Sequence, residues 1–240
     1  MLKQNLIRVM LAASVSAGLA TNAHAATFIP NDPAFPDIRI TEYMYKPGVS
    51  PGEFVQFTNL GTTAVNMSGW SEDDATGTPG VHSLSGLGTL QPGQSGILAQ
   101  ASQSAFDSAW SIPSSVPYVV ENGTDNLGSA DTIFLFDGNN IVDELVYGSG
   151  TGPKASAVAA VPGSASVIGT NDWAGWVLLT AGQDGAYKSN GGTGDIGSPG
   201  FSSFATPVPL PAAAWLLISG LGGLVPAMRR RRAAVQVAQA

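Results

Sequence analysis

The sequence predicts an all-β protein built as an antiparallel β-sandwich. Short apolar or alternating segments recur over residues 38–180, and turns rich in Gly and Pro separate them. Only residues 101–112 have the spacing of a helix, with Ala105, Ala109 and Ile112 on one side. Many short strands at regular spacing are typical of two packed antiparallel sheets.

The first strands are predicted at residues 38–45 (IRITEYMY) and 53–60 (EFVQFTNL). Gly48 and Pro51 punctuate the chain between them, so we expect a hairpin. Residues 61–70 turn and return as a further strand, and residues 91–100 are a turn followed by a short strand.

The clearest hairpin is predicted at residues 131–148. Ile133 and Leu135 face one way in its first strand, and the turn residues 137–140 (DGNN) separate it from the second. A last strand is expected within residues 171–180.

The N-terminus has the pattern of a secretory signal peptide. Lys3 and Arg8 precede an apolar run over residues 9–20, and Ala23 and Ala25 fit the A-x-A cleavage pattern. We therefore expect the first 25 residues to be removed. The alternative is a retained anchor helix, which the short apolar run disfavours.

The C-terminus has the pattern of a single membrane-spanning helix. Residues 212–228 are uncharged, mostly apolar and near the lower length limit for a span. Four arginines follow and should stay in the cytoplasm. Pro209 and Pro211 end the preceding structure and hold the chain extended before the helix.

Residues 208–232, VPLPAAAWLLISGLGGLVPAMRRRR, resemble a PEP-CTERM sorting signal of the VPLPA variety. The resemblance implies an exosortase, a membrane cysteine transpeptidase, as partner, and a Gram-negative bacterium that makes exopolysaccharide. The tail, residues 233–240, is longer than usual in such signals. The alternative is a plain anchor that is never cut. The residues expected to serve recognition are Val208, Pro209, Leu210, Pro211 and Ala212. Those expected to serve retention are Arg229, Arg230, Arg231 and Arg232.

The exported part is strongly acidic and lacks cysteine. Residues 26–211 carry four basic against seventeen acidic residues, a formal charge of −13. This charge disfavours nucleic acid as a partner. The absence of cysteine excludes disulfides, thiolate metal sites and cysteine nucleophiles.

The ordered segments ITEYMY, GEFVQFTNLG, AVNMSGW, LQPGQSGIL, DTIFLFDGNNIVDELVYG and GSPG are similar to a bacterial lamin-tail domain. This resemblance implies an immunoglobulin-like β-sandwich that serves as an accessory or interaction module. Gln56 stands where the family often has a second glutamate besides Glu53. The expected organisation is a leader at 26–37, the sandwich at 38–201, a linker at 202–207, the sorting signal at 208–232 and a cytoplasmic tail at 233–240.

Catalytic groups are sparse. His82 is the only histidine of residues 26–240, so neither a Ser-His-Asp triad nor a histidine-rich zinc site is expected, and we predict a surface loop around it. The densest acidic cluster is Glu72, Asp73 and Asp74, for which we expect a solvated loop. The alternatives for this cluster are a weak calcium site and a carboxylate pair for hydrolysis.

The tryptophans suggest sugar stacking as one interpretation. Trp70 is expected in the core, whereas Trp173 and Trp176, three residues apart in a predicted strand, should face opposite sides, with one of them exposed.

The sequence as a whole predicts a non-catalytic exported protein, structural or adhesive in the cell surface, exopolysaccharide or biofilm matrix. Exopolysaccharide or a matrix protein is the expected partner. No cofactor is expected. The alternatives are a calcium-dependent extracellular binding module and a secreted hydrolase that uses a carboxylate pair.

Overall fold

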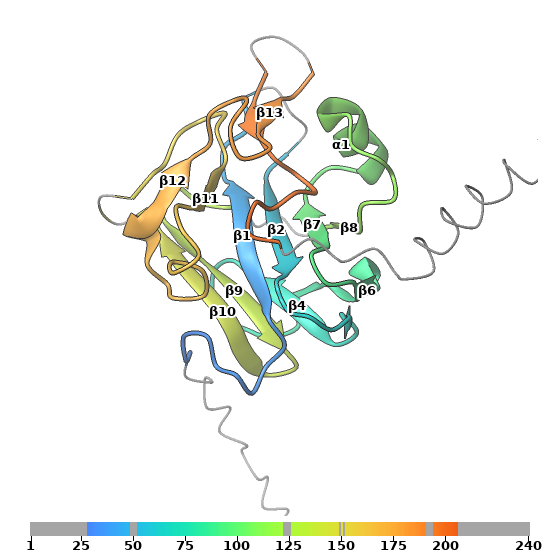
Figure 1. Ribbon diagram of the computed structural model, residues 1–240, viewed down its shortest axis with the longest axis vertical. Helices are drawn as coiled ribbons and strands as arrows, with labels where there is room; N and C mark the ends of the chain where they lie inside the picture. The colour runs from blue at the N-terminus through green and yellow to red at the C-terminus, as the bar shows by residue number, and fades with distance from the viewer. Residues whose placement is uncertain are drawn as a thin grey trace, which may run out of the picture.

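The computed structural model describes residues 28–48, 52–121, 126–148, 150, 152–190 and 194–205. Within them the chain is mostly β, with one short α-helix (Figure 1). The strands are β1 Ile38–Met44, β2 Phe54–Asn59, β3 Val65–Asn66, β4 Trp70–Asp73, β5 His82–Ser83, β6 Thr89–Leu90, β7 Ser95–Ala99, β8 Tyr118–Val120, β9 Asp131–Asp137, β10 Asn140–Tyr147, β11 Ala160–Pro162, β12 Trp176–Leu178, β13 Tyr187–Lys188 and β14 Ile196–Gly197. The helices are α1 Gln103–Trp110 and two 3₁₀ turns, η1 Ser85–Leu87 and η2 Trp173–Gly175.

Six strands form the larger sheet, in the order β12-β11-β1-β2-β7-β8. The predicted hairpin of β1 and β2 is confirmed, since these strands pair antiparallel from Ile38 opposite Asn59 to Met44 opposite Phe54. β11 and β12 lie at the other edge, so residues late in the chain complete a sheet that its first strand begins.

One strand pair departs from the predicted antiparallel arrangement. β8 runs parallel to β7, with Leu98 opposite Val119. Parallel neighbours need a crossover connection, which is usually a helix. The predicted helix, α1, lies between these two strands in the chain and supplies that crossover.

The smaller sheet has four strands in the order β10-β9-β4-β5. The predicted hairpin of β9 and β10 is confirmed, with Asp137 paired to Asn140 across a two-residue turn. Gly138 has φ 59° in that turn, a conformation that glycine adopts without the penalty of a Cβ atom.

The main hydrophobic core contains side chains from the six-stranded sheet and from the four-stranded sheet. Buried residues of β1, β2 and β7 form one cluster with those of β9 and β10. Tyr43 of β1 is at its centre, since its ring packs 4.7 Å from that of Tyr147 and 5.6 Å from that of Trp176. Its hydroxyl accepts a hydrogen bond of 2.8 Å from Trp173 Nε1. The buried Tyr43 hydroxyl therefore has a hydrogen-bond partner inside the core.

A second core covers the other face of the six-stranded sheet. Phe54 of β2 packs edge-on against Phe106 and Trp110 of α1. Phe106 and Trp110, four residues apart on one face of the helix, are its buried residues. Ala109 and Ile112, two of the residues expected on one side of the helix, are partly buried and pack against the same core, whereas Ala105 is exposed.

The predicted signal peptide and the whole predicted sorting signal, with its membrane helix, arginines and tail, lie outside the described residues. Within the described residues, no helix combines the length and the apolar character that a membrane crossing requires.

Candidate functional site

The acidic triplet singled out from the sequence is buried, which corrects the expectation of a solvated loop. Glu72 and Asp73 belong to β4, and Asp74 follows that strand. Their exposed fractions are 2%, 3% and 3%. A charged residue is buried only where polar partners compensate its lost hydration, so these side chains need internal partners.

Glu72 finds its partner in His82. β4 pairs with β5, and the register places these two residues opposite each other. His82 Nδ1 lies 2.9 Å from Glu72 Oε2. His82 is 7% exposed, so the prediction of a surface-loop histidine is wrong. Strand β5 is only two residues long, and so short a segment has no sequence pattern that would predict its pairing with β4.

The second ring nitrogen of His82 faces another carboxylate. His82 Nε2 lies 3.8 Å from Oε1 of Glu121, the residue after β8. The hydrogen bond with Glu72 raises the pKa of His82 to about 9, and the charges of Glu121 and Asp74 act in the same direction. These neighbours therefore favour the protonated, imidazolium form of His82. It connects β5, an edge of the smaller sheet, to the end of β8, an edge of the larger one.

The other acids of this region bind backbone. Asp73 Oδ2 accepts hydrogen bonds from the backbone N–H groups of Thr76 and Thr78, at 2.9 Å each, and one from the Thr76 hydroxyl at 3.0 Å. Glu53 Oε2 accepts one from the Leu127 backbone N–H at 2.6 Å. Burial raises the pKa of Glu53 to about 7.

Glu53 and Gln56 do not form an acidic pair. Gln56 is fully buried and directs its amide to Thr41 Oγ1 and to the backbone of Gly200 and Phe201. Gln56 is therefore a residue that holds the C-terminal part of the domain.

The same contacts bear on the metal alternative. Among the described residues, no group of three or more His, Asp and Glu side chains is arranged to hold a metal ion. Calcium prefers several carboxylate oxygens around one point, whereas Glu72 bonds to His82 and Asp73 to a turn.

The tryptophans considered for sugar stacking face the interior. Trp70 is 3% exposed, which confirms its predicted core position. Trp173 and Trp176 are 7% and 5% exposed, so the expectation that one of them faces solvent is wrong. Trp173 lies in η2, before β12 begins, and the change in backbone turns both rings inward. Trp110, the last residue of α1, is also buried.

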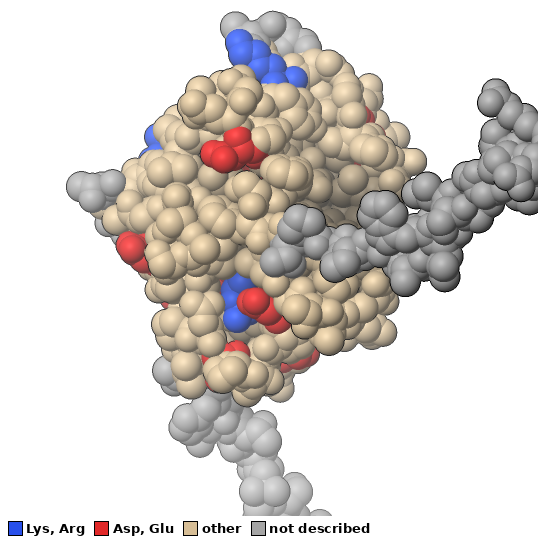
Figure 2. All heavy atoms as spheres, viewed as in Figure 1, with Lys and Arg blue, Asp and Glu red and all other residues tan. Residues whose placement is uncertain are grey.

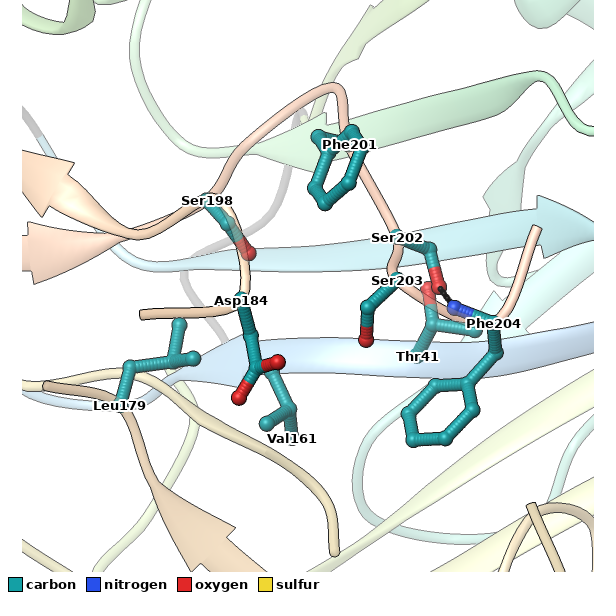
Figure 3. A pocket seen from close by; sticks show the side chains of 9 residues that line it. All are labelled: Thr41, Val161, Leu179, Asp184, Ser198, Phe201, Ser202, Ser203 and Phe204. Carbon is teal, nitrogen blue, oxygen red and sulfur yellow. Dashed lines mark hydrogen bonds between the residues drawn. The ribbon is translucent and has the colours of Figure 1, made fainter. Parts of the chain in front are cut away.

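A small pocket lies on the outer face of the six-stranded sheet. It is bordered by Thr41 of β1 and by the segment after β14, with Phe201 on one side and Phe204 on the other (Figure 3). Asp184 points toward it from the loop before β13. The Glu42 carboxylate, buried close by, accepts two hydrogen bonds from Ser198. Sequence reasoning missed Glu42. The GSPG turn, which contains its partner, was the one available signal.

The acidic composition does not produce one continuous acidic surface. Several of the acids are buried, namely Glu42, Glu72, Asp73, Asp74, Asp143 and Asp195. On the face shown in Figure 2, Asp and Glu atoms form small separate patches between larger uncharged areas. The formal charge of the sequence therefore overstates the negative charge of the surface, because these acidic side chains are internal.

Comparison with known proteins identifies the larger part of this framework. Residues 31–149 match the family described as the Lamin Tail Domain. No curated protein matches the chain, and no solved structure does. The matched residues include the whole four-stranded sheet and strands β1, β2, β7 and β8, together with Glu72 and His82. Strands β11 to β14 follow the matched region. The chain therefore contains a Lamin Tail Domain, over residues 31–149.

Proposed function

We propose that this protein is a non-catalytic, exported component of the cell surface or extracellular matrix, and that an exosortase processes its C-terminus. The observation that carries the proposal is the order of segments in one chain. A signal-peptide pattern comes first, then the Lamin Tail Domain, then a short proline motif, an apolar run and four arginines. In this pattern the prolines would keep the chain extended, the apolar run would hold it in the membrane, and the arginines would stay in the cytoplasm.

The contacts inside the domain support a structural role. His82, with a carboxylate at each ring nitrogen, holds two sheet edges together. Glu42, Gln56 and Asp143 bind backbone groups of distant segments. These side chains stabilise the fold, and none of them needs a reacting partner to explain its position. The finer fold class, an immunoglobulin-like β-sandwich, is part of this proposal, and the core shared by the two sheets supports it.

An exopolysaccharide or a matrix protein is the partner that this proposal implies. Its test begins with delivery, since binding in the matrix requires export and processing. Arg229–Arg232 should be replaced by glutamines in one variant and by lysines in a matched control. Each arginine or lysine opposes insertion by about 2.5 to 3.5 kcal/mol at the centre of a helix. The glutamine variant should therefore leave the membrane unprocessed and reach the medium, while the lysine variant behaves like the parent.

The outcome that would contradict the sorting proposal is equal processing of all three proteins. A parent that stays anchored and uncut in its native host would instead favour the plain membrane anchor.

The calcium-dependent alternative is tested by thermal unfolding of the exported domain. A ligand at 100 times its Kd stabilises a protein by about 2.7 kcal/mol, which raises the midpoint by several degrees. We expect millimolar calcium to act no differently from magnesium at equal ionic strength. A rise with calcium alone, lost on replacing Asp73 and Asp74 by asparagine, would favour the binding module.

A further inference from the structure

The segment after β14 begins with a tight turn. Ser198, Pro199, Gly200 and Phe201 form a type II β-turn, closed by a hydrogen bond of 2.9 Å from the Phe201 N–H to the Ser198 carbonyl. Pro199 occupies the second position, where proline is common, and Gly200, with φ 86°, occupies the third, where this turn type requires a positive φ. The backbone N–H groups of Ser198 and Gly200 remain available to partners outside the turn.

Two buried side chains on adjacent strands accept hydrogen bonds from these N–H groups. Glu42 Oε1 accepts from the Ser198 N–H and Oε2 accepts from its hydroxyl, both at 2.7 Å. Gln56 Oε1 accepts from the Gly200 N–H at 2.7 Å, and Gln56 Nε2 donates to the Phe201 carbonyl at 2.9 Å. Glu42 and Gln56 are paired neighbours on β1 and β2. Each therefore holds the turn by two hydrogen bonds. When Glu42 is protonated, its carboxyl O–H donates to the Ser198 hydroxyl oxygen instead of accepting from it.

The segment lies close against the sheet at this point. A Cβ atom at Gly197 would come within 3.1 Å of Glu42 Oε1 and within 2.9 Å of the Trp110 ring, so only glycine allows this approach. In Figure 1 the orange-red C-terminal segment crosses over β1 and β2. We call residues 198–204 the C-terminal strap.

Glu42 is fully buried, and no ion pair among the described residues involves it. Burial raises its pKa from the ordinary value of 4.5 to about 7, although the Ser198 hydrogen bonds oppose this. Its β2 neighbour Gln56 is uncharged, as is Trp110 of α1, whose ring lies beside the same residue, Gly197. Tyr187 of β13 also interacts with it, and burial raises the pKa of Tyr187 to about 12, so this phenol stays neutral. The exposed Asp184 carboxylate borders the pocket described above.

We propose that the C-terminal strap is releasable, and that it stays attached while Glu42 carries a proton and opens as that proton is lost. A buried carboxylate without a cation is costly once ionised. Opening of the strap returns Glu42 to water, where its charge is hydrated. Proton loss therefore favours the open state by linkage.

Release would lengthen the tether to the C-terminal signal, a consequence that rests on the proposed sorting function. Each residue spans at most about 3.6 Å. With the strap attached, Val208 can lie at most about 14 Å from Phe204 at this extension. With the strap free, it can lie up to about 40 Å from Gly197. A membrane protease would then reach the proline motif without displacing the domain.

Hydrogen exchange of the full chain tests the strap itself. Protection factors of the Ser198 and Gly200 amides, corrected for intrinsic exchange, should be measured at pH 5 and pH 8. The open population should grow roughly 50- to 100-fold over this interval, since the carboxyl titrates near 7 when buried and near 4.5 when open. Amides of β7 provide the reference and should keep their protection.

Two variants make the test specific. Glu42→Gln keeps the acceptor for the Ser198 N–H but cannot ionise, so its strap protection should not depend on pH. Gln56→Ala should lower protection at both pH values while keeping the pH dependence. Asp143→Asn, which removes another buried carboxyl away from the strap, is the matched control and should behave like the parent.

Equal protection at pH 5 and pH 8 in the parent would overturn the proposal, even if no variant folds. So would a Glu42→Gln strap that opens with pH as the parent does. Processing in the native host distinguishes the opening of the strap from its proposed effect on sorting. If exchange behaves as expected but Glu42→Gln is cut as fast as the parent, the strap stands and its link to sorting fails.

Discussion

The Asp143 carboxylate on β10 accepts a hydrogen bond of 2.8 Å from the backbone N–H of Ile40 on β1. The two residues belong to different sheets. Both lie at irregular points, because the β1–β2 register shifts after Ile40 and the β9–β10 register shifts before Asp143. The contact therefore satisfies a backbone donor at a bulge, where ladder pairing is disrupted. At the opposite edge of the smaller sheet, His82 of β5 and Glu121 after β8 form a second contact, so polar side chains join the larger sheet to both edge strands of the smaller one.

Replacing Asp143 by alanine should destabilise the domain by about 1–3 kcal/mol for each donor it leaves unsatisfied. The donors are the backbone N–H groups of Ile40 and Glu144, both at 2.8 Å. Urea unfolding followed by tryptophan fluorescence measures this loss. Asp184→Ala, at an exposed acid, should change the free energy of unfolding by less than 0.5 kcal/mol, roughly the size of ordinary surface effects. Equal effects of the two substitutions would show that the Asp143 contact contributes nothing.

Removing one partner of the Glu72–His82 pair should be severe. His82→Gln leaves the Glu72 carboxylate buried without its cation, and breaking a buried pair in this way costs about 3–5 kcal/mol. The double variant Glu72→Gln, His82→Gln removes both charges and should recover much of that loss. A double-mutant cycle of unfolding free energies measures the coupling. Additive single effects would refute a coupled pair.

Stability should fall as the pH rises from 5 to 9. Burial raises the pKa values of Glu42 and Asp143 to about 7, so the folded chain keeps protons that the unfolded chain has already lost. Their stabilisation is complete below about pH 4 and is lost as pH rises through about 7. That of His82 is complete below its ordinary value of 6.5 and is lost through about pH 9.

Each fully buried carboxyl contributes on the order of 3 kcal/mol to this change. Thermal unfolding at constant ionic strength should therefore show a midpoint several degrees lower at pH 9 than at pH 5. The double variant Glu42→Gln, Asp143→Asn should reduce the slope. A midpoint that rises with pH would contradict the sign derived from these groups.

Truncation after residue 149 should destroy the fold, although the family match ends there. The removed part contains β11 and β12 of the larger sheet and Leu179 and Ala186 of the second core. Residues 26–205 and 26–149 should be compared by limited proteolysis and circular dichroism. The longer chain should resist digestion, whereas the shorter one should be degraded rapidly. Equal resistance would show that the matched region is an independent unit.

The sequence predicted the strands better than the burial of polar residues. The β1–β2 and β9–β10 hairpins follow from alternation and turn residues, which act locally. The two register shifts and the burial of Glu72 depend on partners distant in the chain, so alternation alone could not reveal them. Helical spacing located α1, but the choice of Phe106 and Trp110 as its buried face depends on Phe54 of β2. The parallel pairing of β8 depends on where the helix returns the chain.

The acidic site illustrates the same limit. Three consecutive acids usually indicate a solvated segment, because burying charge is costly. Here His82, eight residues beyond the last of them, provides the compensating charge once β4 and β5 pair. The contact between Glu72 and His82 forms only when the chain folds, so the sequence alone does not reveal it.

Intact mass spectrometry of the protein purified from its native host tests the central claim most directly, because it determines both mature ends. Processing by a signal peptidase and an exosortase predicts a chain that begins at Ala26 and ends near the proline motif at 208–211, without the arginines. A chain that retains residues 1–25 or that still carries Arg229–Arg232 in its final location would contradict this pathway.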